Sequence, residues 1–338
     1  MTKRERIKAA LSGSELDRAP INVWMHHSDI DQDIPRLAET QAEYAKKYDF
    51  DFIKLMPFGL YGVQDYGAEI TFFNQVGKPP LVSKSPINGI KDWSAVKPLD
   101  ATVGVYGKQV ELAHLVVKQA GKEIPVIQTV FSPLTTARKL AGDRILQDIA
   151  DDPALFKQAL EAITETTISF VKANIEAGVD GFFFATQCAT SDFMSADLYR
   201  EFGEQYDRKV IASYNDATWF NVVHIHGDNI FFKQLADYPV PCINWHDRWV
   251  SPSLGEARKI TGKCLLGGLR EAPYTDADGK ITKKSILVTG TEAELKTHVR
   301  EAVESAGRKN LILGPGCVAS PEITAANIQI IRNAVEGL

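Results

Sequence analysis

The chain has 338 residues, of which 44% are hydrophobic and 24% charged, and its formal net charge is −5. Such a composition belongs to a globular protein with enough apolar residues for a large core. Lysine and arginine are spread among acidic residues, which excludes the basic surface that nucleic-acid binding requires. Because no apolar run approaches the roughly 20 residues that span a bilayer, the sequence also predicts no membrane association.

The cysteines are far apart in the sequence, and each lies in or directly after an apolar run: Cys188, Cys242, Cys264 and Cys317. This spacing is not typical of a disulfide framework, so we expect reduced thiols. Residues 1–11 are rich in charge and predict an amphipathic helix without a signal-peptide core. Together the two observations predict a cytoplasmic protein.

Short apolar runs alternate with longer segments of helical period along the chain, which is typical of βα units and a parallel sheet. A helix over 2–12 comes first. Eight strands are predicted at about Pro20–Met25, Phe52–Met56, Pro125–Phe131, Asp180–Thr186, Phe220–His226, Pro241–Trp245, Cys264–Leu269 and Leu311–Leu313. Helices are predicted at Pro35–Tyr48, Gln109–Ala120, Leu134–Leu140, Pro153–Ala177, 195–214, Leu254–Thr261, Glu292–Ala306 and Pro321–Glu336.

Eight strands that are each followed by helix indicate an α/β fold, a (β/α)₈ TIM barrel in a single domain over 1–338. Two irregular insertions interrupt it. The segment 59–105 is rich in Gly, Pro and aromatic residues and includes two short predicted strands, and 272–290 is a polar loop. A doubly wound open sheet is the alternative, but no glycine-rich dinucleotide fingerprint follows the first strand.

The C-terminal ends of the strands, where such barrels carry their chemistry, hold a concentration of histidine. Of the seven histidines, five lie at predicted strand ends: His26, His27, His224, His226 and His246. Residues i and i+2 of a strand point to the same face, so His224 and His226 should present two imidazoles side by side. Cys317 follows the last strand in the run Gly-Pro-Gly-Cys.

Two imidazoles and a thiolate are three of the four ligands that a zinc ion takes, whereas magnesium and calcium prefer oxygen. We therefore predict a Zn²⁺ site formed by His224, His226 and Cys317, which would also be the catalytic residues. His246 is the first choice for a fourth ligand, since its strand should neighbour that of His224. Glu271 is the second choice, and a water or the substrate is the third.

Other side chains at the strand ends are predicted to bind a small-molecule substrate: His26, His27, Met56, Gln187, Cys188 and Glu271. Alternatives stay open for several of them. A histidine at a strand end can be purely structural, Cys188 can be a small buried apolar residue, and Met56 can pack in the core. The segment 314–322 can also form an anion cradle at a helix capped by Ser320. The helical residues His114 and His298 are expected on the surface.

These residues resemble landmarks of the uroporphyrinogen decarboxylase superfamily over nearly the whole chain. The superfamily also contains zinc-dependent methyltransferases that take methyl groups from corrinoid proteins. The resemblance rests on the order and spacing of Arg4–Leu11 with Asp17–Ile21, Gly178–Gly181 with Ser195–Tyr199, His224–Gly227, and Gly314–Cys317 with Pro321, Glu322 and Asn327.

Two differences decide between the branches. The decarboxylases carry an Arg-Gln-Ala-Gly-Arg segment after the first strand that grips porphyrinogen carboxylates, and residues 24–29 contain no arginine. The methyltransferases use His-x-Cys and a distant Cys as zinc ligands. This chain matches at His224 and Cys317 but has His226 in place of the first cysteine. The resemblance therefore implies the methyltransferase branch, with a zinc shell richer in nitrogen.

On this basis we expect a zinc-dependent methyltransferase that moves a methyl group from a methylated corrinoid protein, or a related donor, to a thiol or another zinc-activated acceptor. A corrinoid carrier protein would be its partner, and the family implies a homodimer. One alternative is a decarboxylase-like lyase or a metal-dependent hydrolase on the same barrel. The other is a barrel that binds a ligand without catalysis.

Overall fold

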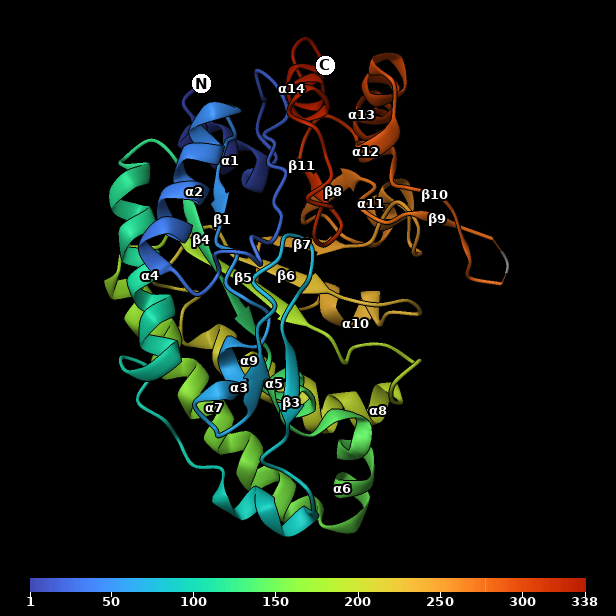
Figure 1. Cartoon of the computed structure of the whole chain (residues 1–338). Helices are drawn as coiled ribbons and strands as arrows, with labels where there is room; N and C mark the ends of the chain where they lie inside the picture. Colours follow the sequence, from blue (N-terminus) through green and yellow to red (C-terminus); the bar gives the residue numbers. More distant parts are fainter. Residues whose placement is uncertain (277) are drawn as a thin grey trace.

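The computed structural model describes residues 1–276 and 278–338. At its centre a parallel sheet of seven strands curls into a barrel, and helices cover its outer face (Figure 1). The strand order is β1-β4-β5-β6-β7-β8-β11. The strands are β1 (Ile53–Lys54), β4 (Val126–Phe131), β5 (Gly181–Thr186), β6 (Val222–Ile225), β7 (Cys242–Trp245), β8 (Cys264–Leu269) and β11 (Leu311–Pro315). They confirm the second to eighth predicted strands, with differences at the ends.

The first predicted strand, Pro20–Met25, is wrong as a regular strand. Its only ladder contact among the described residues is an isolated parallel bridge between Ile21 and Leu313. Pro20 has no N–H to donate, and its carbonyl accepts from Leu313 N at 2.8 Å. On the other side Asp51 N donates to the carbonyl of Ile21 at 3.0 Å. This extended segment therefore fills the eighth position between β11 and β1 and closes the barrel with few bonds.

The helices follow the predicted order, and the helix over Glu292–Ala306 is confirmed residue for residue. Asp152 caps the longest helix by accepting from Leu155 N. The helices are α1 (Lys3–Ser12), α2 (Ile34–Lys47), α3 (Tyr61–Gln64), α4 (Gly104–Ala120), α5 (Pro133–Ala141), α6 (Ile145–Asp151), α7 (Pro153–Glu176), α8 (Ala196–Tyr199), α9 (Gln205–Ala212), α10 (Phe232–Ala236), α11 (Leu254–Ile260), α12 (Ile286–Thr289), α13 (Glu292–Ala306) and α14 (Ala325–Asn333).

The insertions and the C-terminal helix differ in part from expectation. The short strands predicted in 59–105 are present as the antiparallel pair β2 (Glu69–Thr71) and β3 (Leu81–Lys84). The loop 272–290 was expected to be irregular, but it contains the pair β9 (Tyr274–Thr275) and β10 (Ile281–Lys283), which projects from the barrel (Figure 1). The last helix begins at Ala325 rather than at Pro321, because Thr324 is its cap.

Two apolar clusters organise the core. The larger one lies between the sheet and the surrounding helices, and the smaller one fills the barrel interior with residues such as Phe52, Phe183 and Leu266. Ile7 and Ala10 of α1 belong to the interior cluster. Helix α1 therefore plugs one end of the barrel. No helix among the described residues is long and apolar enough to cross a bilayer.

A buried network of charges holds this plugged end together. Asp51, directly before β1, is fully buried and accepts from Arg6 Nη1 of α1 at 2.6 Å and from Arg18 Nη1 at 2.7 Å. It also accepts from the backbone N–H of Ile21 at 2.8 Å. One carboxylate thus joins the plug helix, the closing segment and the sheet. Buried charges are tolerated only when they are paired in this way.

Asp51→Ala should lower the free energy of unfolding by about 3–5 kcal/mol, because two buried guanidinium groups lose their counter-charge. Urea denaturation followed by circular dichroism measures the change. Glu69→Ala is the matched control, since Glu69 pairs with Lys84 on the surface and its loss should leave stability nearly unchanged. Equal effects of the two substitutions would contradict the structural role of Asp51.

His298 was expected on the surface, and this prediction is wrong. The side chain is buried on α13, where its Nε2 accepts from Arg270 N at 3.0 Å and its Nδ1 lies 2.6 Å from Arg248 Nη2. Burial, together with the two arginines, lowers the pKa of His298 to about 3. The native state therefore keeps this imidazole neutral at a pH where the unfolded chain protonates it. His114 on α4 is exposed, as expected.

The lowered pKa of His298 predicts a defined pH dependence. As pH falls below about 6.5 the unfolded state binds a proton that the native state rejects, so wild-type stability decreases. His298→Gln removes this proton uptake. We expect wild type to lose up to about 1.4 kcal/mol per pH unit relative to His298→Gln between pH 6 and 4.5. Urea titrations at several pH values test this, with His114→Gln as the control, and parallel curves for wild type and His298→Gln would contradict it.

Candidate metal centre

Four donor side chains meet at the C-terminal ends of three strands, an edge of the barrel that we call the mouth. His224 lies on β6 and His226 directly follows it, while His246 follows β7 and Cys317 follows the β11 loop. Their ligand atoms all lie within 4.8 Å of one another, so one metal ion could contact all four. This donor cluster unites the three expected ligands with the first choice for the fourth.

The distances within the donor cluster are short. His226 Nδ1 lies 3.2 Å from His246 Nε2 and 3.7 Å from Cys317 Sγ. The ring centroids of His226 and His246 are 4.9 Å apart, and those of His224 and His246 are 5.9 Å apart. Three imidazoles and a thiol therefore converge on one point, as the strand-end pattern predicted.

A side chain that the sequence argument missed orients His224. Asn244 on β7 is the register partner of His224 on β6, and its Oδ1 lies 2.6 Å from His224 Nδ1. Asn244 Nδ2 donates to the carbonyls of Leu266 at 2.7 Å and Pro315 at 3.2 Å, which assigns Oδ1 as the acceptor. His224 Nδ1 must then carry the proton. Its Nε2 keeps a free lone pair, and this buried atom has no partner among the described residues.

Glu271 orients His246 in the same way. Its Oε1 lies 2.6 Å from His246 Nδ1 and also accepts from Trp249 Nε1 at 3.1 Å. A carboxylate that binds one imidazole nitrogen leaves the other nitrogen unprotonated and directs it outward, which is the usual arrangement behind a metal-ligating histidine. Glu271, the second choice for a ligand, is thus placed behind the donor cluster instead of in it.

The approach of Cys317 depends on the glycine before it. A Cβ on Gly316 would lie 2.7 Å from the Cα of His246 and 3.0 Å from Glu271 Oε2, so any larger residue would push the loop outward. Gly316 N donates to Glu271 Oε2 at 3.1 Å. The alternative of an anion cradle at a helix starting near Pro321 is wrong, because α14 begins later and Gly316 N already has a partner.

Burial sets the charge of the donor cluster. It holds the pKa of His224 well below its usual range and lowers that of His226 to about 4. These imidazoles are neutral at pH 7 and can offer lone pairs. Burial also raises the pKa of the Cys317 thiol to about 12, because a thiolate is unfavourable there without a cation. A metal ion would supply that missing positive charge.

A cavity of about 200 Å³ adjoins the donor cluster and includes His224 and Cys317 in its wall. Three of the predicted substrate residues line it: His26, Met56 and Gln187. Lys54 and Lys139 line it as well, and the sequence argument did not single them out. We call this space the central cavity. It places room for a small molecule directly beside the candidate metal position.

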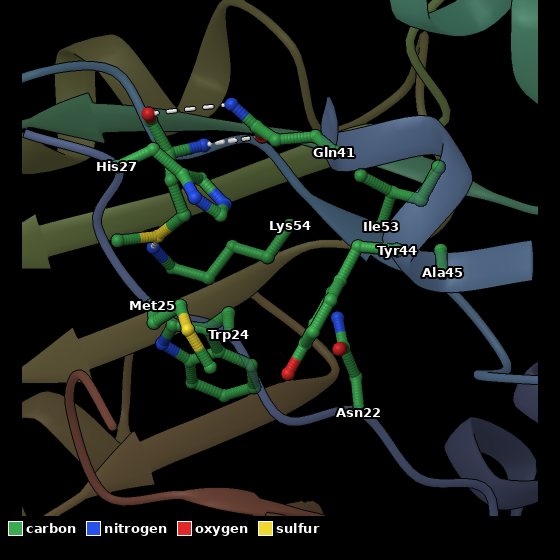
Figure 2. Close-up of a pocket in the computed structure, with 10 residues that line it drawn as sticks. Asn22, Trp24, Met25, His27, Gln41, Tyr44, Ala45, Ile53 and Lys54 are labelled. Carbon is green, nitrogen blue, oxygen red and sulfur yellow. Dashed lines mark hydrogen bonds between the residues drawn. The ribbon is translucent and has the colours of Figure 1, made fainter. Parts of the chain in front are cut away.

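Two further residues predicted to bind substrate lie elsewhere. His27 lines a separate cavity of about 20 Å³, together with Trp24, Gln41 and Tyr44 (Figure 2). Cys188 is fully buried, with its Sγ 3.9 Å from the carbonyl of Leu134. The structure therefore brings neither side chain into the wall of the central cavity. Adjacent residues of an extended chain face opposite ways, which explains why His26 and His27 separate.

A signal for one of the missed residues is present in the sequence. Asn244 precedes His246 by two positions in the apolar run Cys-Ile-Asn-Trp-His, so a polar side chain shares the inward face with a ligand candidate. No comparable pattern marks Lys54 or Lys139. Their meeting depends on the packing of β1 against α5, which local periodicity does not reveal.

A family model described as uroporphyrinogen decarboxylase (URO-D) matches residues 2–338. The chain belongs to this family. Among its curated members, methylcobamide:CoM methyltransferase MtaA from Methanosarcina barkeri is 27% identical over 268 residues, which cover 78% of this chain and 73% of the relative. Methylcobamide:CoM methyltransferase MtbA from Methanosarcina mazei is 20% identical over 352 residues, covering 97% and 96%. The resemblance inferred from the sequence motifs is thus confirmed.

A solved structure supports the fold. A methyltransferase from Methanosarcina mazei superposes with a TM-score of 0.82 at 22% identity, covering 99% of this chain and 98% of that one. The sheet and helices of this family member therefore follow the same path over nearly the whole chain. The expectation of a TIM-barrel-like α/β fold is confirmed, with the seven-stranded sheet and the closing segment described above.

Glu271→Gln should weaken metal binding about ten- to hundredfold, because a neutral amide holds His246 less firmly and makes its imidazole less basic. Competition with a chromophoric chelator measures the affinity. Glu304→Gln, on an exposed part of α13, is the matched control and should bind metal like wild type. An unchanged affinity for Glu271→Gln would show that His246 is no ligand.

Proposed function

We propose that this family member is a zinc-dependent methyltransferase that moves a methyl group from a methylated corrinoid, or a related donor, to a thiol acceptor. The observation that carries the proposal is the donor cluster, in which His224, His226, His246 and Cys317 have their ligand atoms within 4.8 Å of one another. The names of the curated relatives, which act as methylcobamide:CoM methyltransferases, support the choice of reaction.

Zinc fits the donor cluster better than other common ions. Bonds of about 2.0–2.1 Å to nitrogen and 2.3 Å to sulfur place tetrahedral ligands roughly 3.3–3.6 Å apart. The distances of 3.2 Å and 3.7 Å from His226 Nδ1 to His246 and Cys317 agree with this spacing. The free lone pair of His224 Nε2 is a further observation in favour. Mixed imidazole and thiolate ligands suit zinc and not magnesium or calcium.

When bound, zinc would lower the pKa of an acceptor thiol and hold its sulfur as a nucleophile at neutral pH. The residues of the chain do the positioning. Asn244 and Glu271 keep His224 and His246 in the tautomers that leave their lone pairs free. Four protein donors fill a tetrahedron, so the acceptor sulfur would add as a fifth ligand or replace one of them.

The two substrates would approach from different places. The central cavity of about 200 Å³ is below the roughly 300–1,000 Å³ of clefts that enclose drug-sized ligands. It suits a small acceptor and is too small for a corrinoid ring system. The donor would therefore dock over the mouth on its carrier protein. Transfer forms a sulfur–carbon bond and breaks the cobalt–carbon bond, whose electron pair stays on cobalt.

The same volume disfavours a tetrapyrrole decarboxylase, the rival function within this family, because a porphyrinogen exceeds the central cavity. Residues 24–29, beside the cavity, also provide no arginine for porphyrinogen carboxylates. A homodimer is not required by the proposed chemistry, since all four donors come from one chain. A hydrolase or a ligand-binding barrel without catalysis predicts no methyl transfer and is separated by the assay below.

Freshly purified protein should contain about one zinc per chain by plasma mass spectrometry, consistent with a closed set of strong donors. His224→Ala and Cys317→Ser should each reduce zinc content below half an equivalent. They should also slow transfer from methylcobalamin to a thiol, followed by the cobalt absorbance, by at least about 100-fold. His114→Ala on the exposed face of α4 is the control.

Two results would contradict the proposal. One is a zinc content below half an equivalent that His224→Ala does not change. The other is a zinc-loaded protein that transfers no methyl group from methylcobalamin or a methylated corrinoid protein to any thiol. Hydrolysis of simple esters or amides by the same preparation would then favour the hydrolase.

A further inference from the structure

The central cavity carries positive charge that nothing in its wall neutralises. Lys54 of β1 and Lys139 of α5 both line it, near the donor cluster residues His224 and Cys317. No aspartate or glutamate belongs to the wall as far as the described residues define it. The two lysines come from elements on different sides of the barrel wall, a strand and an outer helix. A cavity with cations and no carboxylate is complementary to an anion.

Lys54 is the more unusual of the two. Its side chain is only 5% exposed, and its Nζ has a single hydrogen-bond acceptor, the sulfur of Met56 at 2.9 Å. The ammonium also lies over the rings of Phe183 at 4.4 Å and Trp24 at 5.6 Å. An ammonium has three N–H donors, and a thioether is a weak acceptor. Most of the hydrogen-bonding capacity of Lys54 is therefore unused.

Lys139 provides the second cation. Its Nζ donates to the carbonyl of Gly59 at 2.9 Å and lies 4.3 Å from the ring centroid of Phe131. Neither contact supplies a negative charge. Burial lowers the pKa of Lys54 to about 7 and that of Lys139 to about 8, as expected for cations that lack a counter-ion. An anion between them would restore both charges.

The space on the far side of Lys54 cannot hold that anion. The cavity of about 20 Å³ in Figure 2, lined by Lys54 with Trp24 and Tyr44, has room for one water molecule at most. Trp24 Nε1 and Tyr44 Oη are buried without partners among the described residues, and both could use such a water. The central cavity is ten times larger and also reaches Cys317.

We infer that Lys54 and Lys139 form an anion subsite, so that the methyl acceptor is a short thiol with an anionic group such as a carboxylate. The inference rests on the proposed function for the thiol, whereas the anion follows from the lysines alone. Sulfur would lie at the Cys317 end of the central cavity and the anion at the lysines. The volume limits the acceptor to roughly six to ten non-hydrogen atoms, since a cavity of about 150 Å³ accommodates benzene.

The test compares 3-mercaptopropionate with its neutral counterpart 3-mercapto-1-propanol by titration calorimetry on the zinc-loaded protein. Wild type should bind the carboxylate at least about tenfold more tightly. Lys54→Met keeps the length of the side chain and removes the charge. It should weaken binding of 3-mercaptopropionate about ten- to hundredfold and change that of the neutral thiol by less than about threefold. Lys139→Met should act in the same direction.

Lys118→Met, on the exposed face of α4, is the matched control and should bind both thiols like wild type. Circular dichroism confirms that each variant is folded. Equal affinity of wild type for the two thiols would overturn the inference. So would a Lys54→Met variant that binds 3-mercaptopropionate like wild type.

Propionate, which has no sulfur, separates this inference from the proposed function. If propionate competes for the site in wild type and not in Lys54→Met, the anion subsite stands even when no thiol is methylated. If instead thiols are methylated with no preference for the anionic one and propionate does not compete, the methyltransferase stands and the subsite falls. The two ideas can therefore fail independently.

Discussion

The hydrogen bonds of one buried amide hold the candidate metal centre in place. Asn244 lies on β7, accepts from His224 on β6, and donates to carbonyls of β8 and β11. Its side chain therefore connects the strands that carry three of the four donors. Because each bond fixes the role of the amide atoms, the tautomer of His224 follows from the fold of the barrel. Position and protonation of the ligand are set by the same contacts.

The barrel treats buried positive charge in two opposite ways at its two ends. At the plugged end Arg6 and Arg18 share Asp51, and the charges are balanced within the chain. At the mouth Lys54 and Lys139 have no such carboxylate in the cavity wall as far as it is described. Paired charges stabilise a scaffold, whereas an unpaired buried charge is destabilising until a ligand arrives. The contrast separates the part of the molecule that maintains the fold from the part that awaits substrate.

Much of this arrangement could be predicted from local sequence patterns. The alternation of strands and helices placed most elements, and the rule that chemistry lies at strand ends brought His226 and Cys317 together before any coordinates. The first strand failed because Pro20 cannot extend a ladder and the chain after it bonds to a loop. His298 failed because the surroundings of a helix face depend on Arg248 and Arg270, which are distant in sequence. The cavity lysines could not be found for the same reason.

Both chain ends lie at the plugged end of the barrel (Figure 1). The N-terminal amine contacts Asp17, and Glu336 near the other end contacts Arg18 of the same network. A reporter domain or affinity tag fused to either terminus would consequently be suspended on the side opposite the donor cluster. Such fusions leave the approach of a large carrier protein unobstructed, so surface immobilisation through the termini presents the mouth outward.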